Sequence, residues 1–83
     1  MNNKIEPPSL SPALAAMVEV FNQNQNNFVS TIGFLNAGTL SPAAGVAKLK
    51  SKGAIIVTEL RTVTDSKGKS RKNIAHYKLV RWS

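Results

Sequence analysis

The chain of 83 residues contains no cysteine and only one histidine. Disulfides and thiolate metal sites are therefore excluded, and a lone histidine does not make a metal site. No apolar run approaches the roughly 20 residues that span a bilayer, so we expect no membrane partner. Residues 1–9 lack the basic start and apolar stretch of a signal peptide. These absences predict a cytoplasmic protein without a metal.

Acidic residues are also scarce, with four Asp and Glu against eleven Lys and Arg, for a net charge of +7. The four carboxylates are scattered, and no pair of them is spaced for general acid-base catalysis. No motif pairs His76 with a nucleophile, and the glycines do not form a phosphate-binding pattern. The sequence therefore predicts a protein that is not an enzyme and needs no cofactor.

The positive charge is concentrated in the second half of the chain. Residues 1–47 contain one basic and two acidic side chains, whereas residues 48–83 contain ten basic and two acidic ones. A basic half on a small domain is typical of a polyanion binder, with nucleic acid as the usual partner. A surface that only keeps the protein soluble is the alternative.

Two Ser-Pro pairs indicate where helices begin, with the serine as N-cap and the proline as first helical residue. They are Ser11-Pro12 and Ser41-Pro42, while Gly38 and Gly53 suit the ends of helices. Apolar residues recur at helical spacing between these signals. The pattern predicts a flexible tail over residues 1–10 and helices over about 11–24, 30–37 and 42–52.

After Gly53 the sequence changes to β-branched residues with strand periodicity. We expect strands over about 54–63 and 73–80, joined by a polar tip with Gly68. The expected fold is α+β, a winged helix-turn-helix over residues 11–83 with three helices followed by a two-stranded β-hairpin wing. The residues expected to be buried are Val18, Phe21, Ile32, Leu35, Val46, Leu49, Tyr77 and Leu79.

Aromatic residues are few, and most fit this predicted core. Phe21, Phe28, Phe34 and Tyr77 are expected inside it. Trp82 is expected to pack against the core, while stacking on a partner and a place in a dimer interface are the alternatives.

Four segments together resemble a family of short phage and prophage winged helix-turn-helix proteins. They are Ser41–Gly53, Ile55 with Val57-Thr58-Glu59, the tip Asp65–Lys69, and Ala75-His76-Tyr77-Lys78-Leu79. The resemblance covers roughly residues 28–80 and implies a phage-related DNA-binding protein. As we align them, members often carry arginine where this chain has Gly45. The third helix thus has lysine as its only long polar side chain and no residue that pairs bidentately with a base edge.

The leading hypothesis is a small DNA-binding protein, a regulator or an accessory factor for excision or replication. Double-stranded DNA would face the third helix and the basic wing, whose lysines and arginines supply phosphate contacts. The residues predicted to contact DNA are Ser41, Ala44, Gly45, Lys48, Lys52, Arg61, Lys67, Lys69, Arg71 and Lys72. The alternative is a protein-binding module that docks on a host or phage protein through the smooth Ala/Gly face of the third helix. A homodimer is left open.

Overall fold

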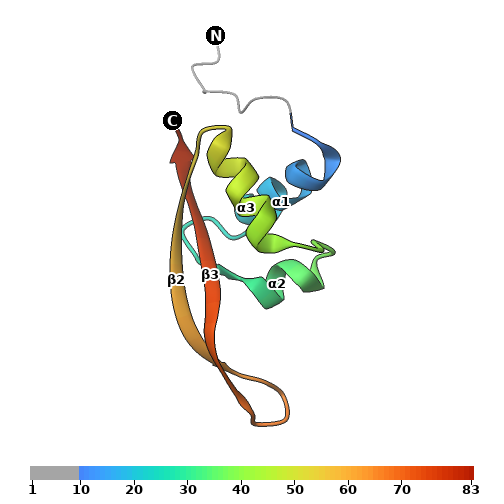
Figure 1. The fold of residues 1–83 in the computed structure, drawn as a ribbon, viewed down its shortest axis with the longest axis vertical. Helices are drawn as coiled ribbons and strands as arrows, with labels where there is room; N and C mark the ends of the chain where they lie inside the picture. The colour runs from blue at the N-terminus through green and yellow to red at the C-terminus, as the bar shows by residue number, and fades with distance from the viewer. Residues whose placement is uncertain (1–9) are drawn as a thin grey trace.

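The computed structural model describes residues 10–83, and it arranges them as three helices and a three-stranded sheet. Figure 1 shows the elements in chain order: α1 (Pro12–Gln23), β1 (Val29–Ser30), α2 (Thr31–Asn36), α3 (Pro42–Ser51), β2 (Ala54–Thr64) and β3 (Ser70–Trp82). The predicted order of three helices followed by a hairpin is confirmed. The predicted tail lies outside the described residues except for Leu10, which packs against the core.

Serine side chains close the N-termini of two helices. The Ser11 hydroxyl accepts a hydrogen bond from the N–H of Leu14 at 3.3 Å, and the Ser30 hydroxyl accepts one from the N–H of Gly33 at 2.9 Å. Each such cap stabilises a helix by about 1 kcal/mol. Ser41 also occupies the N-cap of α3, but its side chain makes no capping hydrogen bond.

The sheet contains three strands, so the prediction of a two-stranded hairpin was incomplete. The strand order is β1-β3-β2, and β1 pairs antiparallel with β3, with Val29 opposite Tyr77. Next to this pairing, the Thr31 hydroxyl donates a hydrogen bond of 2.9 Å to the carbonyl of Ala75. Because β1 has only two residues, it shows no alternation by which a sequence could reveal it.

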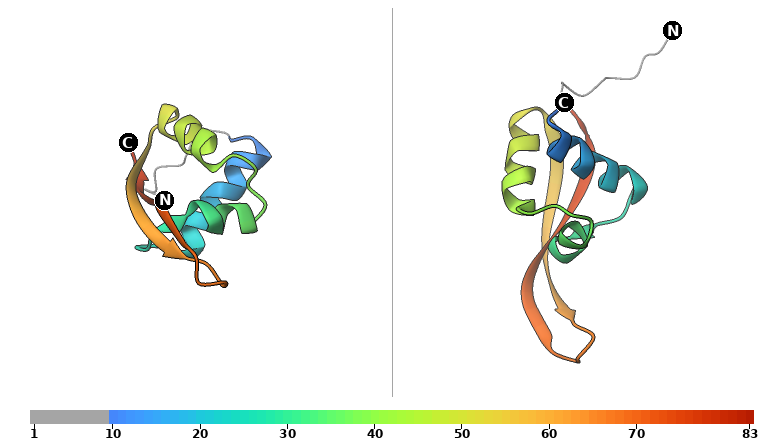
Figure 2. Two further views of the ribbon diagram at one scale, coloured as in Figure 1. Left: turned by 60° about the horizontal axis from the view of Figure 1, so that its bottom comes forward. Right: turned by 90° about the vertical axis from the view of Figure 1, so that its right-hand side faces the viewer.

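The three helices lie on one face of the sheet, and the hairpin of β2 and β3 continues past them (Figures 1 and 2). Phe34 fills the centre of the core, with its ring 5.0 Å from that of Phe21 and 6.2 Å from that of Tyr77. The buried hydrophobic residues are Leu14, Met17, Phe21, Val29, Phe34, Val46, Leu49, Ala54, Ile56 and Tyr77. None of the helices in residues 10–83 is both long and apolar enough to cross a membrane.

Four of the eight residues expected to be buried are buried, namely Phe21, Val46, Leu49 and Tyr77. Val18, Ile32 and Leu79 are only partly buried. The prediction for Leu35 was wrong, since 48% of it is exposed. The helix α2 has only six residues, and it turns Phe34 inward instead. Trp82 is partly buried and packs against the core, as expected.

The hairpin has an inner face toward the helices and an outer face turned away from them. Ala54 and Ile56 of β2 are buried on the inner face, whereas Ile55 and Val57 alternate with them on the outer face and are exposed. Phe28 was expected in the core, but it lies outside it and contacts the side chains of Arg61 and Lys78 on the outer face.

Candidate nucleic-acid interface

The helix α3 presents small residues and lysines on its exposed side. Pro42, Gly45, Val46 and Leu49 are buried, and they hold the opposite side of the helix against the core. The residues of α3 left exposed are Ala43, Ala44, Ala47, Lys48, Lys50 and Ser51. The exposed side is therefore positively charged but without side chains that distinguish one base pair from another through paired hydrogen bonds.

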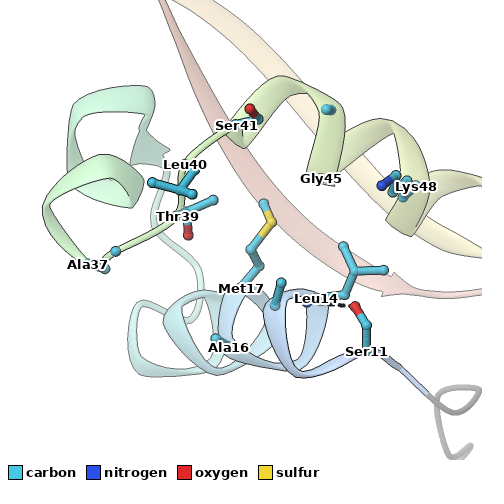
Figure 3. Close-up of a pocket in the computed structure, with 13 residues that line it drawn as sticks. Ser11, Leu14, Ala16, Met17, Ala37, Thr39, Leu40, Ser41, Gly45 and Lys48 are labelled. Carbon is cyan, nitrogen blue, oxygen red and sulfur yellow. Dashed lines mark hydrogen bonds between the residues drawn. The ribbon is translucent and has the colours of Figure 1, made fainter.

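Gly45, which the sequence predicted to contact DNA, is buried and does not belong to this exposed side. A Cβ atom placed on Gly45 would collide with Sδ of Met17 and lie 3.0 Å from Cε of the same side chain. Figure 3 shows Met17 and Leu14 reaching from α1 toward α3 at this point. The glycine allows the two helices to approach closely, since it faces Met17 of α1 and lines the cleft between the two helices.

The other predicted residues of α3 are exposed. The hydroxyl of Ser41 is not engaged as a cap, and Ala44, Lys48 and Lys52 are open to solvent. Lys48 lies in the last turn of the helix, where a positive charge also stabilises the helix dipole. Its charge therefore has a structural role beside any contact with phosphate.

Asp65 shapes the wing tip, which comprises residues 65–69. One oxygen of its carboxylate, Oδ1, accepts hydrogen bonds from the N–H groups of Lys67 and Lys69, each at 2.9 Å. Its backbone N–H donates to the carbonyl of Lys69 at 2.8 Å, and its carbonyl accepts from the N–H of Gly68 at 3.0 Å. Gly68 has φ +80°, which a glycine adopts without strain. The tip is therefore held in one shape, with the side chains of both lysines exposed.

The remaining basic residues of the wing differ in their surroundings. Arg71 forms an ion pair with Asp65, with 3.7 Å between Nε and Oδ2, so part of its charge is balanced locally. Within residues 10–83, Lys67, Lys69 and Lys72 make no ion pair, and all three are exposed. These three lysines are the cations of the wing most available to an anionic partner.

Arg61 lies apart from the tip and is engaged within the domain. Its Nε is 2.7 Å from Oε1 of Glu59, and its guanidinium carbon is 4.7 Å from the centre of the Phe28 ring. The hydrogen bond from Arg61 lowers the pKa of the Glu59 carboxyl below its usual value. The Nζ of Lys78 also approaches Phe28, at 5.7 Å from the ring centre. No local pattern in the sequence indicated this aromatic platform, because it joins three separate strands or turns.

A cleft of about 350 Å³ lies between α1 and α3, beside the turn that connects α2 with α3 (Figure 3). Leu14 and Met17 form one wall, and Ala44 and Lys48 form the other. Leu40, at the rim, is 92% exposed. The smooth surface expected on α3 is therefore present in part, as one wall of an apolar cleft.

The comparison with protein families matches residues 22–81 to the winged helix-turn-helix domain. The chain belongs to this family. In the winged helix-turn-helix domain, α2 and α3 form the helix-turn-helix and the hairpin of β2 and β3 forms the wing. The family points to DNA as the general partner of the domain. The comparisons with curated proteins and with solved structures gave no significant match.

Proposed function

We propose that this winged helix-turn-helix domain binds double-stranded DNA through the exposed side of α3 and the wing, and that it is not an enzyme. The observation that carries the proposal is the preshaped wing tip, which displays Lys67 and Lys69 with Lys72 nearby and free of ion pairs within residues 10–83. Such lysines match the phosphate backbone, and a basic wing can reach a groove beside the helix.

The wing and α3 would contribute differently to DNA binding. The lysines supply phosphate contacts, which give affinity for any sequence. The exposed alanines of α3 offer only apolar contact, for example with the methyl group of thymine. We therefore expect strong salt dependence and weak discrimination between sequences. In keeping with the resemblance described above, we propose a phage-type accessory factor or regulator that acts in the bacterial cytoplasm.

A salt series on mixed-sequence duplex DNA tests the proposal. Each phosphate contact contributes about 0.9 to the slope of log K against log salt. The double substitution Lys67→Ala with Lys69→Ala should therefore flatten the slope by about 1.8. Fluorescence anisotropy of a labelled duplex at several salt concentrations measures this slope.

The matched control removes two positive charges from the outer face, through Lys78→Ala with Arg81→Ala. These residues pair with Val57 and Ile55, away from the wing tip. The control should leave the slope close to that of the unmodified protein, because its two residues do not lie at the tip. If only the net charge of the protein mattered, both variants would flatten the slope equally. A tip variant with an unchanged slope, or equal effects of the two pairs, would reject the wing as a DNA-binding element.

A second candidate function rests on the cleft between α1 and α3. Its apolar walls and the exposed Leu40 suit a side chain of a host or phage protein. In that case the domain would be a protein-binding module. Failure to bind duplex DNA even at low salt would favour this candidate over the first.

A further inference from the structure

Among residues 10–83, no strand pairs with the outer edge of β2, so this edge of the sheet is open. The strand β2 stands last in the order β1-β3-β2 and runs for 11 residues without a proline or a lysine. The pairing of β2 with β3 shifts register twice, between Ile55 and Ile56 and between Arg61 and Val63, and each time the extra residue is on β3. Edge strands are usually protected by charged side chains, above all lysine, by proline or by bulges. The strand β2 has no proline, no lysine and no extra residue of its own, and Glu59 and Arg61 are its only charged side chains.

Hydrogen bonding on the far side of β3 shows which backbone groups of β2 face outward. The carbonyl of Ala75 accepts a hydrogen bond from the hydroxyl of Thr31, which directly follows β1. Because β1 and β2 lie on opposite sides of β3, this carbonyl points away from β2. Ala75 lies opposite Leu60. Ala75 and Leu60 are therefore a pair whose backbone groups form no hydrogen bonds with each other. In such a pair the N–H and C=O of Leu60 point away from β3, toward the open edge. The same alternation turns the backbone groups of Thr58 outward, while Thr62 lies at the second register shift.

The sequence around Leu60 is complementary to itself in the antiparallel direction. If Leu60 lies opposite Leu60 of a second copy, Glu59 lies opposite Arg61 of that copy on the outer face, and the reverse pair forms too. Sliding one strand by two residues, the next step that this backbone pattern allows, brings either two Glu59 or two Arg61 side chains together. Like charges directly opposite destabilise a sheet, whereas opposite charges stabilise it. Charge therefore selects one register.

We propose that two copies of this chain associate by antiparallel pairing of their β2 strands, with the twofold axis between the two Leu60 residues. The surface fits such a role, since Leu60 is 61% exposed and Val57 is 45% exposed. Glu59 and Arg61, with 49% and 43% of their side chains exposed, form their present ion pair at the surface and would form a four-charge network in the dimer. A twofold interface uses the same patch on both copies, as this strand does.

Charge reversal tests the proposal on the full chain by analytical ultracentrifugation without nucleic acid, so its failure leaves the DNA-binding proposal untouched. The unmodified chain should show a concentration-dependent dimer. Arg61→Glu would place four acidic groups at the interface, and Glu59→Arg would place four basic ones. Each should raise the dimer Kd by about tenfold or more. Circular dichroism checks that both variants are folded, which is expected because the substituted side chains are exposed.

Two recombinations of these variants supply the controls. The double substitution Glu59→Arg with Arg61→Glu restores the opposite charges and should restore the dimer. An equal mixture of the two single variants should form a heterodimer, since the two acidic groups on one copy then lie opposite two basic groups on the other. A chain that stays monomeric at every concentration would overturn the proposal. A dimer Kd that neither charge reversal changes would also overturn it, and so would a mixture of the two single variants that fails to associate.

Discussion

The contact of Gly45 with Met17 makes a measurable prediction about helix packing. Replacing glycine by alanine inside a helix normally stabilises it by about 1 kcal/mol. Here the new methyl group would collide with Sδ of Met17, a side chain that is only 2% exposed. Overpacking costs about 1–3 kcal/mol, and the lower part of this range applies because Sδ and Cε are the end of the flexible Met17 side chain, which lines the cleft between α1 and α3. The substitution Gly45→Ala should therefore change the free energy of unfolding by between about zero and a loss of 1 kcal/mol.

A double-mutant cycle separates these two effects. In the background of Met17→Ala the collision is absent, so Gly45→Ala should stabilise the domain by about 1 kcal/mol. The two substitutions should then be coupled by about 1–2 kcal/mol. Urea denaturation of the four proteins measures all corners of the cycle. If Gly45→Ala stabilises both backgrounds equally, Gly45 does not face Met17.

Two further predictions concern the core and the wing tip. Leu49 is fully buried, so Leu49→Ala should lower the free energy of unfolding by about 2–5 kcal/mol; a loss below about 0.5 kcal/mol in chemical denaturation would contradict its place in the core. Asp65→Ala removes the acceptor that holds Lys67 and Lys69, whereas Asp65→Asn keeps an acceptor and removes the same charge. We expect tighter DNA binding by Asp65→Asn than by Asp65→Ala in anisotropy titrations, and equal affinities would show that the tip need not be preshaped.

The helix boundaries could be predicted because their signals are local. The Ser-Pro pairs mark the starts of α1 and α3, and Gly38 and Gly53 follow the ends of α2 and α3 with positive φ values. The change from helical to strand periodicity after Gly53 likewise located β2. Each of these features depends on neighbours within a few residues.

The failures have the opposite cause, since they depend on contacts between distant segments. Small residues of α3 occur on every side of the helix, so its sequence pattern did not show that Gly45 faces inward. The contact with Met17 of α1 shows this, and it joins segments far apart in the sequence. Arg61 was predicted to contact DNA, and the sequence did not show that Glu59 and Phe28 engage it on the outer face. In α2, six residues are too few to fix which side is buried, and this explains the error at Leu35.

The separation between the wing tip and the core has an evolutionary consequence. No residue from 64 to 72 belongs to the buried core, because the hairpin continues past the helices. Substitutions or insertions in this stretch can therefore alter charge and reach while the packing around Phe34 is preserved. The tip is the part of the domain in which binding properties can diverge between descendants, and into which a new recognition loop can be grafted, at little cost in folding.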